Sequence, residues 1–375
     1  MLNRNVASST VGTASSKHII LAGVIALALG TQHTILLKQD GSVWSTARGS
    51  RAVANHFAQV IHTGAIAVAA NNHYSIALKH DGSVWTTAMR ANAQLSFFDK
   101  SPTSTSTFAV VHTITDAVAV GAGGYHAMVV TQGGGVWGAG WNKYGQLGDG
   151  STQSRTTFVQ VMPGEAKAAA VAVAVGAGDV HSVVVKRDGS VWGTGRNRNG
   201  QLGDGSHTDR KSFRKVMSSG AADVAAGGYH SMVLMQDGSV RATGCNDYGQ
   251  LGDGSTTDRT KHVLVVSSGA KAVAAGRRHS MVLKQDGSVW AAGYNKYGQL
   301  GDGSTRNSNV FHAVMCGGGA GVGAGGYHSM VIDEDGGIWG SGSNEYGQLG
   351  DGSTLSVDEF VRLRPFEEGM VVGRM

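Results

Sequence analysis

The sequence AKAVAAGRRHSMVLKQDGSVWAAGYNKYGQLGDG, at residues 270–303, contains one complete example of the pattern on which the architecture depends. Its short apolar run Ala272–Ala275 ends at a glycine, and Ser280–Lys284 follows with apolar residues bounded by polar ones. The pair Asp286-Gly287 predicts a two-residue hairpin of type I′, because Asp and Gly tolerate the positive φ that this turn requires. Val289–Ala292 is then the returning strand. This segment therefore predicts short antiparallel β-strands.

The rest of the unit consists of a glycine-rich loop and one more strand. Glycine is too frequent in Gly298–Gly303 for a strand, so we expect a loop there. In the neighbouring copy, His262–Val266 has the apolar pattern of a fourth strand. We find no helical periodicity long enough to compete with this interpretation. Four short strands per unit are typical of a β-propeller blade.

The unit recurs seven times, so the repeats cover nearly the whole chain. An anchoring histidine marks each copy: His33, His73, His126, His181, His230, His279 and His328. A second block, Tyr-Gly-Gln-Leu-Gly-Asp-Gly-Ser, begins at Tyr144, Tyr248, Tyr297 and Tyr346, and Asn199 replaces the tyrosine in the fourth copy. We expect a tail over residues 1–17 and a single domain over 18–375. Its repeats should span about 24–66, 67–116, 117–171, 172–221, 222–270, 271–319 and 320–368.

These motifs resemble the regulator of chromosome condensation repeat family. The resemblance rests on the Gly-Gly-Tyr-His-Ser start, the Asp-Gly-x-Val-Trp hairpin and the Gly-Gln-Leu-Gly-x-Gly loop, which is intact in five of the seven copies. Tryptophan–aspartate propellers have a shorter unit with a Trp-Asp ending, and kelch units lack the Gly-Gln-Leu-Gly loop. The resemblance implies an all-β fold: a seven-bladed β-propeller of four-stranded antiparallel blades.

Composition agrees with a folded repeat protein and excludes several other classes. Of 375 residues, 58 are Gly and only 3 are Pro, which argues against collagen-like and proline-rich chains. Hydrophobic residues make up 41% and charged residues 15%, which suits a substantial core and not a disordered chain. Two cysteines cannot form a disulfide framework. The net charge of +5 permits an acidic partner without requiring nucleic acid, which we consider unlikely as a partner.

The first two repeats depart from the pattern. Ala47–His56 has lost the glycine-rich loop, and repeat 2 keeps only Ala93–Ser96 before the Ser/Thr-rich stretch Ser101–Thr107. A propeller must also join its last blade to its first, because open edges expose unpaired backbone groups. We expect a segment within Lys17–Gly23 to pair with repeat 7, with Val371-Val372 as the competing candidate.

The N-terminal segment allows two interpretations. Arg4 and Lys17 precede the apolar run Ile19–Leu29, and no acidic residue occurs before residue 40. This pattern resembles a signal peptide, but Val24–Gly30 also aligns with the first strand of the other repeats. We favour a retained strand and a cytoplasmic or nuclear location, with a cleaved secretory or organellar signal as the alternative. The run is too short to span a bilayer.

Residues present in every repeat are expected to serve folding. A ring of seven histidines suits no usual metal geometry, so we assign the anchoring histidines a structural role. Six hairpin tryptophans are expected to pack between blades: Trp44, Trp85, Trp137, Trp192, Trp290 and Trp339. The repeated loop aspartates cap turns in this interpretation, because one carboxylate per loop offers too few ligands for Ca²⁺.

No catalytic or cofactor motif is visible. The glycine-rich loops lack the Gly-Lys-Ser/Thr ending of a phosphate-binding loop, and no nucleophile–base pair stands out. We therefore expect no cofactor, no metal and no enzymatic activity. Some members of the resembling family absorb ultraviolet light through Trp in Gly-Trp-Arg-His-Thr motifs. The matching positions here are Gly124, Gly228, Arg277 and Gly326, so we do not expect photoreception.

Positions that vary between repeats are free for recognition. The residue before the anchoring histidine runs Gln32, Asn72, Tyr125, Val180, Tyr229, Arg278 and Tyr327. If the anchor loops open on one face, these residues form a mixed aromatic and cationic ring. Tyr and Arg are typical anchors of protein interfaces. The alternative is that they only line the loop entrance.

Charge is unevenly distributed. Residues 186–306 hold 17 Lys/Arg and 10 Asp/Glu, whereas residues 307–375 hold 3 and 9. Arg196, Arg198, Arg277 and Arg278 belong to the basic sector and could steer an acidic partner. The first pair follows a hairpin strand and the second pair leads into one, so the sequence leaves open whether they share a face. A solvated surface is the alternative interpretation.

These observations predict a non-catalytic propeller that presents loops to another protein. The partner would be an acidic protein or a small GTPase. The alternative, implied by the family resemblance, is guanine-nucleotide exchange on a Ran-type GTPase. We find no hairpin-sized insertion of the kind that the Ran exchange factor uses, and fold alone does not fix function.

Overall fold

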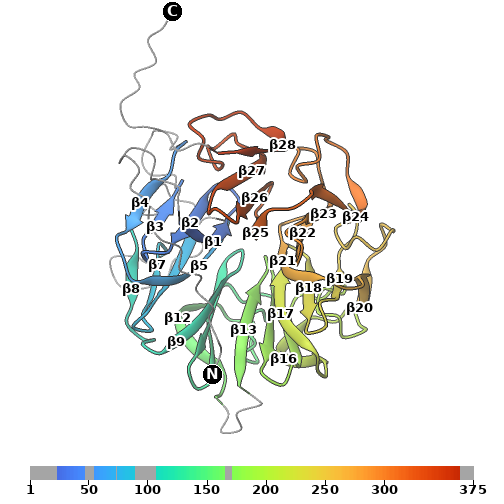
Figure 1. The fold of residues 1–375 in the computed structure, drawn as a ribbon. Coiled ribbons are helices and arrows are strands. Elements are labelled where there is room, and N and C mark those ends of the chain that lie inside the picture. The colour runs from blue at the N-terminus through green and yellow to red at the C-terminus, as the bar shows by residue number, and fades with distance from the viewer. Residues whose placement is uncertain (1–22, 47–54, 73, 89–106, 165–170, 364–375) are drawn as a thin grey trace, which may run out of the picture.

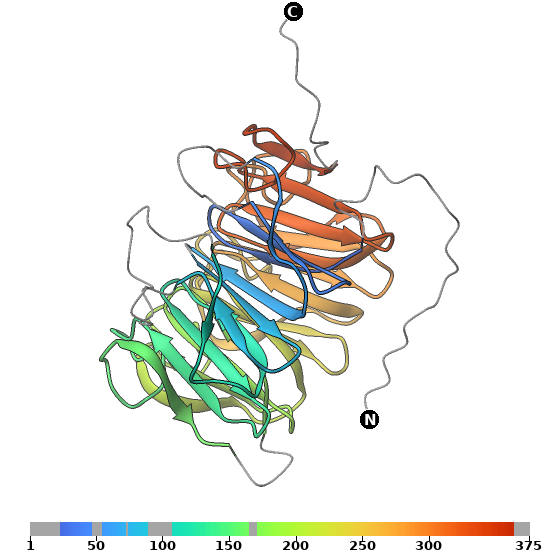
Figure 2. The ribbon, with the colours of Figure 1, turned by 90° about the vertical axis from the view of Figure 1, so that its left-hand side faces the viewer.

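The computed structural model describes residues 23–46, 55–72, 74–88, 107–164 and 171–363, and these form a ring of seven sheets (Figure 1). Each sheet has four strands paired antiparallel in sequence order, from the strand nearest the central axis to the rim. Figure 2 shows the same blades stacked side by side around the ring. The described residues contain no helix, and hence no helix that could cross a membrane. The predicted seven-bladed, all-β fold is confirmed.

The strands follow one another blade by blade. Blade 1 contains β1 (Val24–Leu29), β2 (Thr34–Lys38), β3 (Val43–Ser45) and β4 (Ala58–Ile61). Blade 2 contains β5 (Ala65–Asn71), β6 (Tyr74–Lys79), β7 (Val84–Thr86) and β8 (Ala109–Val111). Blade 3 contains β9 (Ala117–Ala122), β10 (His126–Thr131), β11 (Val136–Gly140) and β12 (Arg155–Met162). Blade 4 contains β13 (Ala172–Ala177), β14 (His181–Lys186), β15 (Val191–Gly195) and β16 (Arg210–Met217).

The last three blades have the same lengths in their first three strands. Blade 5 contains β17 (Ala221–Ala226), β18 (His230–Met235), β19 (Val240–Gly244) and β20 (Arg259–Val266). Blade 6 contains β21 (Ala270–Ala275), β22 (His279–Lys284), β23 (Val289–Gly293) and β24 (Ser308–Met315). Blade 7 contains β25 (Gly319–Ala324), β26 (His328–Asp333), β27 (Ile338–Gly342) and β28 (Val357–Arg362).

The position of a strand within its blade explains its sequence. The second strand, such as β22, is buried over all but its last residue, because neighbouring blades cover both of its faces. Strands buried on both faces show continuous apolar runs instead of alternation. The outer strand, such as β24, has only exposed and half-buried residues, as expected at the rim. The core is therefore divided into clusters that lie between adjacent blades.

The hairpin after the second strand differs from the predicted two-residue type I′ turn. In blade 6, the amide of Gly287 donates to Lys284 O at 3.1 Å, and the amide of Lys284 donates to Ser288 O at 2.9 Å. These bonds enclose three loop residues, with Gly287 at φ +77°. The Asp286 carboxylate accepts the Ser288 amide at 2.9 Å. The glycine therefore supplies one left-handed residue after an ordinary turn, and Asp acts as a cap.

Hydrogen bonds of the anchoring histidines join neighbouring blades. The Nε2 atom of His230 in blade 5 lies 2.8 Å from the Ser280 hydroxyl of blade 6, and Ser280 donates to Gln250 O of blade 5 at 2.7 Å. Because the Ser280 hydroxyl already donates its hydrogen to the carbonyl, it can only accept from His230. The Nε2 atom of His230 therefore carries the proton, and Nδ1 does not. The equivalent histidine pairs are His33–Ser75, His126–Ser182, His181–Ser231, His279–Ser329 and His328–Thr34.

One of these connections is built differently. In blade 2 the strand register places Tyr74, and not the predicted His73, at the position of the anchoring histidine: β6 pairs Ser75 with Ala70 as β22 pairs Ser280 with Ala275. His73 lies outside the described residues, and blade 3 carries Ala127 at the position of the serine. The Tyr74 hydroxyl of blade 2 instead donates to the backbone carbonyl of His126 in blade 3. A buried tyrosine thus supplies an interblade hydrogen bond where the common hydroxyl is absent.

The ring closes through contacts between blades 7 and 1. His328 reaches the Thr34 hydroxyl at 2.9 Å, and the Gly326 amide donates to Gly30 O at 3.1 Å. The four strands of blade 7 all come from residues 319–362. The two segments predicted to close the ring, Lys17–Gly23 and Val371-Val372, lie outside the described residues except for Gly23.

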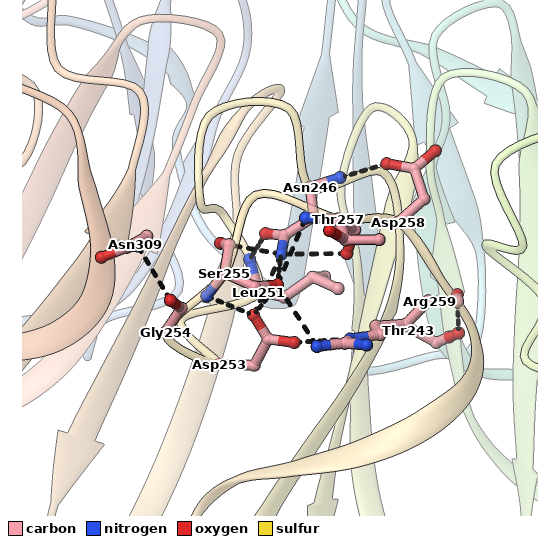
Figure 3. A network of polar contacts seen from close by, with 10 residues as sticks. All are labelled: Thr243, Asn246, Leu251, Asp253, Gly254, Ser255, Thr257, Asp258, Arg259 and Asn309. Carbon is pink, nitrogen blue, oxygen red and sulfur yellow. Dashed lines mark hydrogen bonds and ion pairs between the residues drawn. The ribbon is translucent and has the colours of Figure 1, made fainter.

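The glycine-rich loops are held by a buried asparagine (Figure 3). In blade 5, Asn246 Oδ1 accepts the Leu251 amide at 3.0 Å, and Nδ2 donates to Asp253 Oδ1 at 3.0 Å. Asp253 also accepts the Ser255 amide and pairs with Arg259 at 2.6 Å. The loop then contacts the next blade, where Gly254 donates to Asn309 O at 2.8 Å. The loop aspartate is therefore fully used inside its own turn.

Burial controls the charge of the anchoring histidines. Desolvation lowers the pKa of His126, His181, His279 and His328 to about 3, and that of His230 to about 4. An unfolded histidine has a pKa of about 6.5. Between these values the unfolded chain binds protons that the folded chain does not, so folding becomes less favourable as pH falls.

We expect acid to unfold the propeller well above the pKa values of its folded histidines. Each such histidine should remove about 1.4 kcal/mol of unfolding free energy per pH unit below about pH 6.5. Urea unfolding at pH 7.5, 6.5 and 5.5 measures this dependence. A His230→Gln variant should show a shallower pH dependence by the share of one histidine, and an unaltered slope would contradict the assignment.

The serine in the interblade bond is expected to be important for stability. Ser280→Ala leaves the His230 Nε2–H group buried without its acceptor, which should cost about 1–3 kcal/mol. The measurement is the free energy of urea unfolding at pH 7.5. Ser218→Ala, at an exposed position between β16 and β17, is the matched control and should change little.

Candidate functional site

Two variable positions of each regular blade lie side by side on one face of the ring. The residue after the third strand donates its amide to the carbonyl of the residue before the anchoring histidine, as in Tyr294 to Arg278 at 2.9 Å. The same bond joins Trp141 to Tyr125, Arg196 to Val180, Cys245 to Tyr229 and Ser343 to Tyr327. We call the surface formed by these pairs and by the first residues of the glycine-rich loops the loop face.

Aromatic side chains form one cluster on the loop face of blade 3. Trp141 stands edge-on to Tyr125, with ring centroids 5.8 Å apart, and edge-on to Tyr144 at 5.4 Å. These geometries are favourable for aromatic pairs. All three side chains are half-buried, so each keeps part of its ring accessible.

A larger aromatic cluster spans blades 5, 6 and 7. Tyr294 lies 4.8 Å from Tyr248 and 6.3 Å from both Tyr297 and Tyr327, measured between ring centroids. Tyr297 and Tyr327 are 5.2 Å apart. Partial burial, followed by the neighbouring tyrosines, raises the pKa of Tyr294. The Tyr294 phenol is therefore neutral at physiological pH.

Arg277 and Arg278 are held by this aromatic cluster. Arg277 donates to the Tyr327 hydroxyl at 3.1 Å and lies 3.5 Å from the Asp179 carboxylate of blade 4. Arg278 donates to the Tyr248 hydroxyl at 3.1 Å, with its guanidinium 5.0 Å from the ring centroid. Both guanidinium groups are half-buried and already have acceptors.

Arg196 and Arg198 lie on the same face as Arg277 and Arg278. Arg196 is stacked between rings of two other blades, and Arg198 is exposed two residues further along the loop. The arrangement left open by the sequence is therefore settled: the four arginines share the loop face. Other members of the basic sector lie elsewhere, because Lys211, Arg214 and Lys215 belong to the outer strand β16.

The residues two positions before the anchoring histidines surround the central axis. Asp179 from blade 4 and Arg277 from blade 6 meet there, beside a hollow of about 70 Å³. Burial raises the pKa of Asp179, and the nearby arginines oppose that shift. Gly228 of blade 5 lies between them, and a Cβ on it would come within 2.6 Å of Arg277 O. A side chain at this position, such as the Trp of a light-absorbing motif, would displace the ion pair.

The anchoring histidines and hairpin tryptophans lie away from the loop face. Trp290 packs into the core cluster between blades 5 and 6, and Trp192 into that between blades 3 and 4. Lys284 covers the Trp290 ring at 3.7 Å, and the indole N–H donates to Ser288 at 3.0 Å. These tryptophans are thus placed to join blades.

Sequence analysis missed several residues of the loop face. It singled out the position before the histidine but not its neighbour after the third strand, where Trp141 and Tyr294 stand. It also treated Tyr144, Tyr248 and Tyr297 only as parts of the loop motif. The position after the third strand varies between repeats, and this variation was the available signal. Its residues in blades 3 to 7 are Trp141, Arg196, Cys245, Tyr294 and Ser343.

One group of residues has the composition of a metal site. Ligand atoms of Cys245, Asp247 and Asp258 lie within 4.8 Å of one another. However, the Cys245 thiol donates to Asp247 at 3.3 Å, and Asp258 accepts from Asn246 and Asn199. Burial raises the pKa of the thiol to about 11, so it stays protonated at neutral pH. The group satisfies itself by hydrogen bonds.

Comparison with known proteins identifies the repeats. Two family models, both described as the Regulator of chromosome condensation (RCC1) repeat, match more than half of the chain between them. The first matches residues 117–146, 172–201, 221–250, 270–299 and 320–348, and the second matches 133–185, 188–234 and 237–283.

The curated relatives match over part of the chain. The Ultraviolet-B receptor UVR8 of Arabidopsis thaliana is 36% identical over 105 residues, which are 28% of this chain and 23% of that protein. The Regulator of chromosome condensation of Drosophila melanogaster is 37% identical over 97 residues, which are 24% of this chain and 16% of that protein. The matched segments thus span less than a quarter of these relatives.

Solved structures share the fold over most of the chain. Human WBSCR16 is 20% identical with a TM-score of 0.71, covering 83% of this chain and 87% of that one. Yeast RCC1 (Prp20), solved bound to Kap60, is 17% identical with a TM-score of 0.57, covering 91% of this chain and 75% of that one. With matching repeats over more than half of its length and a ring of seven blades, the chain belongs to the RCC1 repeat family.

Proposed function

We propose that this chain is a non-catalytic scaffold that binds a partner protein through its loop face. The observation that carries the proposal is the division of labour within each repeat. Residues shared by all regular blades are buried and hydrogen-bonded to one another, as His230, Ser280 and Asn246 are. Residues that differ between blades converge on one face as tyrosines, a tryptophan and arginines.

The chemistry of the loop face supports protein recognition. Tyr, Trp and Arg are enriched among the residues that dominate binding energy at protein interfaces. Mutual stacking and hydrogen bonds, such as those of Tyr294 and Arg278, hold the side chains in place before a partner arrives. Preorganisation of this kind lowers the entropic cost of association.

Guanine-nucleotide exchange on a Ran-type GTPase is the second candidate. It is supported by the shared fold with yeast Prp20p, whose structure is described together with its binding to Gsp1p and histones. That likeness, at 18% identity and a TM-score of 0.55, speaks for the fold alone. The scaffold proposal needs no activity beyond binding and therefore stands first.

A loop-face variant tests the proposal. Tyr125→Ala combined with Tyr297→Ala should reduce capture of the partner from an extract of the source organism by at least tenfold, since about 1.4 kcal/mol corresponds to that factor. Quantitative mass spectrometry of the bound proteins gives the measurement. The matched control removes exposed apolar side chains from outer strands, Leu264→Ala with Val310→Ala, and should leave capture intact.

An equal loss in both variants, or a loss in neither, would contradict binding at the loop face. Thermal unfolding of each variant at pH 7.5 shows whether the fold is retained, so that a folding defect is not taken for a binding defect.

Nucleotide exchange separates the two candidates. For a scaffold, the rate at which Ran and other small GTPases release fluorescent GDP should be unchanged by adding the protein. Acceleration of about tenfold or more with any of them, sensitive to the Tyr125 and Tyr297 substitutions, would favour the exchange function instead.

A further inference from the structure

Arg196 has an unusual environment on the loop face. Its guanidinium carbon lies 5.2 Å from the ring centroid of Tyr144 in blade 3 and 5.7 Å from that of Tyr229 in blade 5. The side chain of blade 4 is therefore held between aromatic rings from the blades on either side. Cation–π contacts of this kind are attractive and restrict the orientation of the guanidinium plane.

The Arg196 guanidinium has no acceptor among the residues that the structure describes. Its Nε atom is buried without a hydrogen-bond partner. By contrast, Arg259 pairs with Asp253 at 2.6 Å, and Arg278 donates to the Tyr248 hydroxyl. The Nε atom of Arg277 is also buried without a hydrogen-bond partner, but it lies 3.5 Å from the Asp179 carboxylate. Partly desolvating a charge without pairing it is unfavourable, so Arg196 retains the capacity to gain from an acceptor.

The surroundings of Arg196 favour a negatively charged ligand. Two cationic residues next to this site in the sequence are exposed: Arg198, two residues after Arg196, and Lys143, which directly precedes Tyr144. The two closest acidic residues in sequence already have partners: Asp188 accepts the Ser190 amide at 2.9 Å, and Asp204 pairs with Arg210 at 2.6 Å. Asp179 of the same blade is engaged with Arg277 at 3.5 Å. The Tyr144 and Tyr229 hydroxyls make no hydrogen bond to the described residues. A carboxylate would thus meet a positive guanidinium flanked by two phenolic donors.

We propose that Arg196, flanked by Tyr144 and Tyr229, anchors an Asp or Glu side chain on an acidic segment of the partner protein. The proposal rests on the proposed function and specifies the chemistry of the partner. A planar guanidinium binds a carboxylate through two parallel charge-assisted hydrogen bonds. Because the two rings already hold Arg196, little conformational entropy is lost when those bonds form.

A peptide titration tests this site on the full chain. The probe is a synthetic peptide in which Glu and Tyr alternate, and the matched peptide carries Gln in place of Glu. The ¹H–¹⁵N signal of Arg196 Nε is assigned by its disappearance in Arg196→Lys. We expect this signal to shift with the Glu peptide and to stay in place with the Gln peptide.

Binding of the same peptide gives a second readout. Arg196→Gln should weaken its affinity at least about tenfold, and Arg196→Lys should lie between, since lysine keeps the charge without the planar pair of donors. Arg214→Gln, on the outer strand of the same blade, makes the same change of net charge and should leave the affinity unchanged. Matching unfolding midpoints confirm that the variants fold.

Several outcomes would overturn the proposal. An Arg196 signal that does not shift with the Glu peptide would contradict binding at this site. Equal losses of peptide affinity in the Arg196→Gln and Arg214→Gln variants would show that net charge, and not a specific site, attracts the peptide. A peptide with phosphoserine at the Glu positions that binds while the Glu peptide does not would make this a phosphate site. Arg196→Gln could leave partner capture intact while Tyr125→Ala with Tyr297→Ala removes it. That result would contradict the role of Arg196 but support binding at the loop face.

Discussion

The hydrogen bond from an anchoring histidine to a hydroxyl of the next blade, present at six of the seven junctions, is the contact on which the ring depends. A buried imidazole must be neutral and must place its remaining N–H on an acceptor. The Ser280 hydroxyl accepts the hydrogen bond of His230 and donates its own hydrogen bond to Gln250 O. Three residues from two blades are thus joined by two hydrogen bonds. The pair His328–Thr34 applies the same arrangement at the junction of the last and first blades. Closure therefore follows from the repeated bond itself.

The buried residues common to the blades form their hydrogen bonds with one another. The residues that vary between blades are therefore not needed for those bonds. The same constraint that buries His and Asn places the residue before the histidine and the residue after the third strand on one surface. Tyr125 with Trp141, and Arg278 with Tyr294, are products of that geometry. Recognition can change from blade to blade without altering the bonds that close the ring, which suits a family whose members share a fold and differ in function.

The arginines of the loop face illustrate how much the neighbouring blades matter. Arg277 spans the central axis to Asp179, which is possible because Gly228 of the intervening blade has no side chain. Arg278 is held by Tyr248, whereas Arg196 is stacked between two rings and keeps its donors free for a ligand. Residues of one type, in one sector of the sequence, thus have different chemical roles.

Repetition in the sequence was enough to predict seven blades with four strands in each, because strand pattern and turn signals are local. The prediction of a two-residue turn at Asp286-Gly287 was wrong, because the same Asp-Gly pair occurs in turns of two and of three residues. Only the tertiary structure showed which arginines are paired. It also placed Trp141, Tyr144 and Tyr294 on the same face as those arginines. Those contacts join residues of neighbouring blades or, for Arg277 and Asp179, of blades two apart, and only the packing of blades around the central axis brings such residues together.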